Sequence, residues 1–207
     1  MIHNIIFDMG NVLIHWRPEL FMERMELPQE DRRLLMEEVF GSVEWIQLDR
    51  GSIPFDQGIA AMCRRLPERL HSTARELTLR WWKDHLLPVD GMAELVRELK
   101  EMGLGIYLLS NAKLDLPLYF DQIPGSEYFD GRIVSADWKL LKPQPELYQV
   151  LLREYGLKAE ECFFIDDLNI NIEAAILTGM SGTIFRGLEP LRQALRQAGV
   201  PLKDSAV

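Results

Sequence analysis

The residues best suited to chemistry in this chain stand directly behind short apolar runs. Asp8 follows the first run, Ser110 and Asn111 follow a second, and Asp166 and Asp167 follow a third. In an open parallel α/β sheet, ligands bind at the carboxyl ends of the strands, so we expect these side chains at one sheet edge. Three carboxylates held together repel one another, and a divalent cation relieves that repulsion. Mg²⁺ prefers oxygen ligands such as carboxylates, phosphate and water, so the pattern predicts a magnesium site.

A lysine completes the set. Lys142 precedes a predicted helix and would add one positive charge to this edge. The Ser110 hydroxyl and the Asn111 amide are good donors to phosphate oxygens. Carboxylates, a metal ion, a hydroxyl and a lysine together favour phosphoryl transfer. An aspartate is an established nucleophile for such chemistry, through an aspartyl-phosphate.

The elements that must position these residues alternate between strands and helices. Short apolar runs without polar alternation predict strands that are buried on both faces, and apolar stripes at helical spacing predict helices between them. This alternation predicts an α/β fold with a doubly wound parallel sheet. Strands are expected at 4–7, 106–109, 132–135, 162–165 and 183–185, and helices at 92–99, 145–155, 171–177 and 188–198.

The segment from about Pro18 to Pro88 has a different pattern. Apolar and charged residues mix at helical spacing, and the breaks between them fall mostly at prolines. This spacing is typical of helices with one apolar face, and no run in the segment predicts a strand. We therefore expect an α-helical insertion at 16–87, within a core formed by 1–15 and 88–207.

The composition is that of an acidic globular protein. The chain has 207 residues, with Lys+Arg 23, Asp+Glu 32 and a formal net charge of −9. This charge argues against nucleic-acid binding, which needs a basic surface, but it allows a small phosphorylated ligand at a locally positive site. Cys63 and Cys162 have the spacing of neither a disulfide framework nor a zinc site. With no targeting segment and no apolar run of about 20 residues, we expect a cytoplasmic protein without a membrane partner. The sequence gives no indication of the oligomeric state.

Taken in order, these segments resemble the motifs of the haloacid dehalogenase (HAD) superfamily of hydrolases. The resemblance extends over essentially the whole chain, and the helical segment 16–87 resembles the cap of subfamily I in its phosphatase-like members. The segments that carry the resemblance are Phe7-Asp8-Met9-Gly10-Asn11-Val12-Leu13, Leu108-Leu109-Ser110-Asn111, Lys142-Pro143 and Phe164-Ile165-Asp166-Asp167 in the core, with Trp45, Leu48-Asp49-Arg50-Gly51 and Ile53 in the cap.

The resemblance implies a Mg²⁺ site and a nucleophile. Asp8 would be both the nucleophile and a metal ligand, and Gly10 would offer its backbone carbonyl to Mg²⁺. Asp167 would bind the metal directly, whereas Asp166 would bind it directly or through water.

The remaining motifs imply a phosphoryl-binding role. Ser110 and Asn111 would hold the phosphoryl group, and Lys142 would neutralise charge between that group and Asp8. The implied reaction is hydrolysis of a small phosphorylated metabolite, and a sugar phosphate is our first expectation for it.

One position departs from the family pattern. The family's second aspartate, two residues after the nucleophile, protonates the leaving group and then activates water, and here that position is Gly10. A missing acid or base costs about 10²–10⁴ in rate. The Asp-x-Gly-Asn pattern is similar to that of active sugar-1-phosphate phosphatases. We therefore expect an active enzyme in which His15, a cap residue or the substrate itself takes the role.

Two other functions stay open at this point. A metal-independent 2-haloacid dehalogenase would use the same aspartate to attack carbon, although the Asp166-Asp167 pair argues against it. A degenerate phosphate-binding protein would have lost turnover together with the acid/base, and Gly10 is the residue that favours this alternative.

Overall fold

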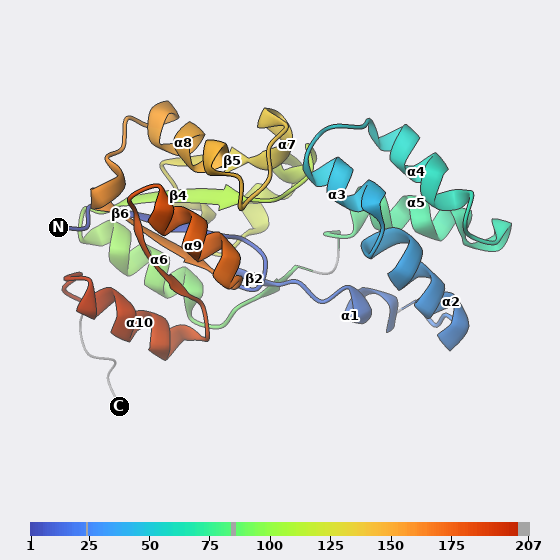
Figure 1. Ribbon diagram of the computed structural model, residues 1–207. Coiled ribbons are helices and arrows are strands. Elements are labelled where there is room, and N and C mark those ends of the chain that lie inside the picture. Colours follow the sequence, from blue (N-terminus) through green and yellow to red (C-terminus); the bar gives the residue numbers. More distant parts are fainter. Residues whose placement is uncertain (24, 84–85, 203–207) are drawn as a thin grey trace.

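The computed structural model describes residues 1–23, 25–83 and 86–202, and at its centre is a five-stranded parallel sheet (Figure 1). The strand order is β5-β4-β1-β6-β7, and each neighbouring pair is parallel. The strands are β1 (Asn4–Phe7), β4 (Gly105–Ser110), β5 (Gly131–Val134), β6 (Cys162–Asp166) and β7 (Ser181–Ile184).

Helices cover both faces of this sheet. Ile5 and Phe7 of β1 belong to one buried cluster with residues of α6 (Met92–Glu101) and α10 (Leu188–Gln197). The intervening Ile6 belongs to a second cluster with residues of α8 (Pro145–Glu154) and α9 (Asn169–Leu177). Successive side chains of a strand point to opposite faces, so a strand covered on both sides needs an uninterrupted apolar run. The predicted doubly wound α/β fold is confirmed. The helices of the core are α6 (Met92–Glu101), α7 (Ser135–Trp138), α8 (Pro145–Glu154), α9 (Asn169–Leu177) and α10 (Leu188–Gln197).

The parallel register brings the strand ends to one level. Phe7 at the end of β1 pairs with Leu108 of β4 and with Ile165 of β6. Asp8 therefore follows β1 at the level where Asp166 ends β6, and its backbone N–H donates to the carbonyl of Ile165 at 2.9 Å. The predicted gathering of polar residues at one sheet edge follows from this register.

The regular elements of the described chain between His15 and Leu87 are helical. Two short strands, β2 (Ile14–His15) and β3 (Leu87–Pro88), pair antiparallel at its base. Two-residue strands carry no periodic signal, which is why the sequence does not predict this pair. The helical elements are α1 (Pro18–Glu23), α2 (Gln29–Leu35), a π-helical turn (Met36–Phe40), α3 (Val43–Asp49), α4 (Phe55–Cys63), a 3₁₀ turn (Glu68–Leu70) and α5 (His71–Arg80).

Figure 1 shows α1–α5 to one side of the sheet. The helices pack on the core through aromatic rings, among them Trp81 and Tyr119, whose centroids lie 5.4 Å apart. In the part of the chain that the structure describes, no helix has the length and apolarity needed to cross a membrane. The division of the chain at 16–87 stays a prediction, and 24, 84, 85 and 203–207 lie outside the described residues.

The last strand differs from its predicted bounds. β7 begins at Ser181, two residues before the predicted start at Thr183. A Cβ on Gly182 would lie 2.7 Å from the carbonyl oxygen of Phe164, so the close approach of β6 leaves room only for glycine. Glycine is depleted in strands, and its presence hides this strand start from a pattern-based prediction.

Candidate active site

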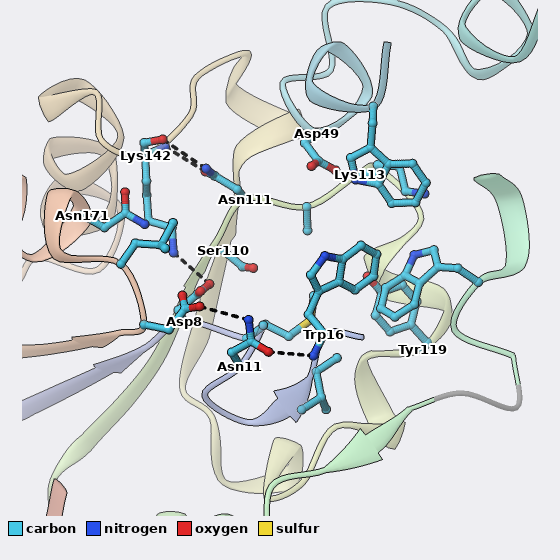
Figure 2. Close-up of a pocket in the computed structure, with 18 residues that line it drawn as sticks. Asp8, Asn11, Trp16, Asp49, Ser110, Asn111, Lys113, Tyr119, Lys142 and Asn171 are labelled. Carbon is cyan, nitrogen blue, oxygen red and sulfur yellow. Dashed lines mark hydrogen bonds and ion pairs between the residues drawn. The ribbon is translucent and has the colours of Figure 1, made fainter. Parts of the chain in front are cut away.

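The strand ends open into a cavity of about 320 Å³ (Figure 2). All but one of the predicted site residues line the cavity together, namely Asp8, Gly10, Ser110, Asn111, Lys142 and Asp167. The exception is Asp166, which is fully buried behind the cavity wall.

Lys142 is the positive centre of this group. Its Nζ lies 2.8 Å from Oδ1 of Asp8 and donates a hydrogen bond of 2.6 Å to Oδ2 of Asp166. Burial opposes the charge of Lys142, but the attraction of the two carboxylates outweighs it, so the pKa of the lysine is raised. Burial also raises the pKa of Asp8, to about 6, and Lys142 limits that rise. One buried cation thus forms ion pairs with two carboxylates. Such pairing compensates the cost of burying charged groups.

Asp166 is held by hydrogen bonds on both of its oxygens. Its Oδ1 accepts from the backbone N–H of Leu168 and from Nδ2 of Asn171, each at 2.9 Å. The hydroxyl of Tyr148 donates to the carbonyl of Asn171 at 2.9 Å and fixes the start of α9. The carboxylate of Asp166 is therefore fixed in place, and its ion pair with Lys142 orients the lysine. Asn171 is a site residue that the sequence pattern did not predict, although an asparagine in the first turn after an acidic strand end is a signal for such a role.

The carboxylates form a cluster that fits a divalent cation. One oxygen from each of Asp8, Asp166 and Asp167 lies within 4.8 Å of the other two. Asp8 and Asp167 line the cavity beside Gly10, whereas Asp166 is occupied by its bonds to Lys142 and Asn171. Carboxylate and carbonyl oxygens are the hard donors that Mg²⁺ prefers. Direct coordination by Asp8, Gly10 and Asp167, with Asp166 behind them, stays a prediction.

Asn11 connects this cluster to the helical segment. Its backbone has a φ of 54°, in the left-handed region that asparagine tolerates better than most residues. Nδ2 of Asn11 donates to Oδ2 of Asp167 at 3.0 Å, and its Oδ1 accepts from the backbone N–H of Trp16 at 3.0 Å. Asn11 was predicted only as part of a motif, without a role of its own. The Gly10-Asn11 pair at this turn is the sequence feature that could have indicated the bridging role of Asn11.

The two residues predicted to hold a phosphoryl group have different surroundings. Ser110 lines the cavity although its residue is only 1% exposed. Asn111 donates from Nδ2 to the carbonyl of Lys142 at 3.1 Å and accepts at Oδ1 from the N–H of Lys142 at 2.8 Å. Its side chain therefore positions the Lys142 loop. Contact of Ser110 and Asn111 with a phosphoryl group stays a prediction.

Gly10 leaves the usual acid/base position without a proton-carrying side chain. A Cβ at Gly10 would meet only Cβ of Trp16 within 4 Å, at an ordinary 3.6 Å, so lack of space does not require glycine. His15, the replacement suggested by the sequence, lies in β2 opposite Leu87. It is not among the described residues that line the cavity. A side chain of the cavity wall that replaces the missing acid/base is therefore a residue other than His15.

Aromatic rings form another wall of the cavity. Trp16 packs edge-on against Trp81, with ring centroids 4.6 Å apart, and lies 5.7 Å from Trp45. Figure 2 shows Trp16 and Tyr119 across the cavity from Asp8 and Lys142. Rings in this arrangement offer an apolar surface to a bound ligand.

A second group of buried charges adjoins the aromatic wall. Lys113 donates from Nζ to the carbonyl of Thr78 at 2.6 Å, and its Nζ lies 3.8 Å from the ring centroid of Trp45. Burial lowers the pKa of Lys113 to about 8, against the attraction of Asp115 and Asp49. Burial raises the pKa of Asp49 to about 7, with Lys113 opposing. No role was predicted for Lys113, and Asp49 was named only for the resemblance of its segment to family caps, because no local sequence pattern predicts that the two side chains meet.

Comparison with known proteins places the chain in a family. The family model of the haloacid dehalogenase-like hydrolases matches residues 2–179. A sesquiterpene phosphatase of Aspergillus oryzae is 31% identical over 186 residues, covering 86% of each protein. The chloroplast flavin mononucleotide hydrolase 1 of Arabidopsis thaliana is 26% identical over 160 residues, covering 75% of this chain and 62% of that protein.

Solved structures share the fold at lower identity. A HAD family enzyme of Bacteroides thetaiotaomicron, in complex with magnesium and inorganic phosphate, has a TM-score of 0.69 and 23% identity over 90% of this chain and 95% of its own. The L-2-haloacid dehalogenase of Xanthobacter autotrophicus has a TM-score of 0.65 and 18% identity over 96% of this chain and 83% of its own. The chain therefore belongs to the haloacid dehalogenase-like hydrolases and is an enzyme whose curated relatives include phosphatases.

Proposed function

We propose that the protein is a Mg²⁺-dependent phosphatase that hydrolyses a small phosphorylated metabolite through an aspartyl-phosphate on Asp8. The observation that carries the proposal is the cluster of Asp8, Asp166 and Asp167 at the strand ends beside one cavity, with Lys142 paired to Asp8 and Asp166. A dehalogenase that needs no metal has no use for such a concentration of carboxylates, whereas a phosphoryl group and a cation match it in charge.

The chain's residues divide the reaction between them. An oxygen of Asp8 attacks phosphorus in line with the leaving group, and water then attacks the aspartyl-phosphate and frees Asp8. Lys142 holds the attacking carboxylate at 2.8 Å, and Asp166 and Asn111 hold Lys142 in turn. Ser110 donates to the phosphoryl oxygens. Magnesium, when bound by Asp8, Asp167 and the Gly10 carbonyl, supplies Lewis-acid neutralisation of the phosphoryl charge.

The proposal extends to the domain organisation and the substrate. Residues 16–87 act as a cap that closes over the core of 1–15 and 88–207 and excludes water. The rings of Trp16, Trp81 and Tyr119 favour a leaving group with apolar surface over a bare sugar. The similarity to a sesquiterpene phosphatase points the same way.

The first experiment is hydrolysis of p-nitrophenyl phosphate with Mg²⁺ and with EDTA, for the wild type and for Asp8→Asn. We expect turnover that needs both the metal and Asp8. The exposed Asp90→Asn, on the core, is the matched control and keeps full activity. Metal-independent release of chloride from 2-chloropropionate would instead establish a dehalogenase. Tight binding of inorganic phosphate without any turnover would establish the degenerate binding protein.

A further inference from the structure

The structure leaves one part of the proposed reaction without a residue. When the ester bond breaks, the leaving oxygen needs a proton, and Gly10 has none to give. This inference rests on the proposed phosphatase function. Of the titratable side chains that line the cavity in the described residues, Asp8, Lys142 and Asp167 already have roles in attack, charge neutralisation and metal binding. The candidates that remain are Asp49, Lys113 and Tyr119.

Among these three candidates, Asp49 is the carboxylic acid, and it lines the cavity. Figure 2 shows it with Lys113 on the opposite side of the cavity from Asp8. In-line attack places the leaving group on the side of phosphorus away from the nucleophile. A donor for the leaving oxygen therefore has to come from the wall that faces Asp8, and Asp49 stands on that wall.

The backbone around Asp49 is fixed to the core, although the residue belongs to α3 of the helical segment. The hydroxyl of Ser135, at the start of α7, donates to the carbonyl oxygen of Asp49. Gly51, two residues on, has a φ of 69°, and a Cβ there would lie 2.2 Å from the carbonyl oxygen of Ala136. The end of α3 thus lies against the core at a position that only glycine permits, and this contact places the Asp49 carboxyl relative to the sheet edge.

The other two candidates fit the role less well. The ammonium of Lys113 is engaged with the carbonyl of Thr78 and the ring of Trp45. Burial raises the pKa of Tyr119 well above its ordinary value, which makes its hydroxyl a poor acid. Burial raises the pKa of Asp49 to about 7. Of the groups that face it, Lys113 and the hydrogen bond from Trp45 oppose this rise, and the charge of Asp115 adds to it.

We propose that Asp49 is the general acid that protonates the leaving oxygen, in place of the aspartate that the family carries at the position of Gly10. As an oxygen of Asp8 bonds to phosphorus, the bond from phosphorus to the leaving oxygen breaks, and the proton of the Asp49 carboxyl passes to that oxygen. The leaving group departs as a neutral alcohol and Asp49 becomes a carboxylate. In the second step water attacks phosphorus, its proton returns to Asp49, and the bond to Asp8 breaks to release phosphate.

The test compares two esters of similar size whose leaving groups differ in basicity. p-Nitrophenyl phosphate releases a weakly basic phenolate, which departs readily without an acid, whereas benzyl phosphate releases a strongly basic alkoxide. We expect Asp49→Asn to lower kcat on benzyl phosphate by about 10²–10⁴-fold and kcat on p-nitrophenyl phosphate by less than about tenfold. The matched control is Asp56→Asn, which makes the same change at an exposed position of α4 and leaves both rates unaltered.

Several outcomes overturn the proposal. Equal losses on the two esters would show a structural role, and a rise in KM alone would show a role in recognition. Wild-type turnover of p-nitrophenyl phosphate without turnover of benzyl phosphate would show that no acid operates. Failure of the phosphatase function itself looks different, because the wild type would then hydrolyse neither ester or would do so in EDTA.

A second variant tests the same idea by rescue. Gly10→Asp restores a carboxyl at the family position, and a Cβ there makes only an ordinary contact with Trp16. In the Asp49→Asn background, we expect Gly10→Asp to recover at least tenfold of the lost kcat on benzyl phosphate. A double variant that hydrolyses p-nitrophenyl phosphate but recovers nothing on benzyl phosphate would count against Asp49 as the proton donor.

Discussion

On one side of the cavity, Asp8 and Lys142 of its wall and the buried Asp166 behind them each lie 2.6–2.8 Å from an opposite charge. On the facing side, Asp49 and Lys113 line the cavity with the buried Asp115 behind them, and burial shifts the pKa values of both lining groups towards neutrality. The pKa of Asp49 rises to about 7 and that of Lys113 falls to about 8. The first group (Asp8, Lys142 and Asp166), which we name the paired wall, keeps its lysine charged, and Lys142 limits the rise that burial causes in the pKa of Asp8, to about 6. The second, the desolvated wall, holds groups that change charge near neutral pH.

This difference matches two different chemical tasks. A nucleophile and a metal site need charges held in a fixed geometry, and close ion pairs supply it. A proton donor has to gain and lose its proton in each cycle, so its pKa is best near the working pH. Burial with incomplete pairing produces such a pKa, and perturbed groups of this kind cluster at functional sites.

The largest effect is expected from breaking the paired wall at its centre. Lys142→Met leaves the carboxylates of Asp8 and Asp166 buried without their cation. Removing one partner of a buried pair destabilises a protein by about 3–5 kcal/mol. Loss of a preorganised charge at the reacting group lowers kcat by at least roughly 10²–10³-fold. Urea unfolding and hydrolysis of p-nitrophenyl phosphate measure the two effects, with the exposed Lys139→Met as control. A variant that stays within tenfold of the wild-type rate would contradict the paired-wall assignment.

The next prediction distinguishes the roles of two aspartates, Asp166 at the end of β6 and Asp167 directly after it. Asp167 lines the cavity, so Asp167→Asn should raise the Mg²⁺ concentration for half-maximal activity by at least about 10–100-fold, the effect seen even for outer partners of metal sites. Asp166→Asn should instead lower the melting temperature more strongly, because it removes the buried partner of Lys142. Titration of activity with Mg²⁺ and thermal unfolding of both variants make the comparison. The reverse pattern would exchange the two roles.

The paired wall could be predicted from the sequence and the desolvated wall could not. Asp8, Ser110 and Asp166 each follow an apolar run, and parallel pairing brings such positions together, so local patterns contain the information. Asp49 and Lys113 approach only because α3 packs against the core beside α7. No local period encodes that packing. The same limit explains why the sequence gives no signal that Asn111 bonds to the backbone of Lys142. The roles suggested for His15 in proton transfer and for Asn111 in holding a phosphoryl group stay predictions.

A smaller effect concerns the aromatic surface beside the desolvated wall. Trp81→Leu removes ring contacts with Trp16 and Tyr119 and opens the cavity. We expect KM for benzyl phosphate to rise about tenfold, the lower end of what apolar pocket contacts contribute. Inhibition by inorganic phosphate, which has no apolar part to contact the rings, should change little. Trp138→Leu, outside the cavity, is the control. Equal weakening of both ligands would mean that Trp81 supports the fold rather than binding the leaving group.

The smallest effect tests the desolvated wall without any substrate. In the unfolded chain Asp49 has its ordinary pKa of 3.8, and in the folded chain about 7. Between these values the unfolded state releases a proton that the folded state keeps, so the stability present at low pH is lost as the pH rises to about 7. Asp49→Asn has no such proton, although Lys113, Asp115 and Tyr119 still titrate around it. Its melting temperature relative to the wild type should therefore be higher at pH 8 than at pH 5, by about 2–4 °C for each kcal/mol. Circular dichroism melts across this range, with Asp56→Asn alongside, make the measurement, and a difference that does not vary with pH would show that Asp49 is already ionised in the folded protein.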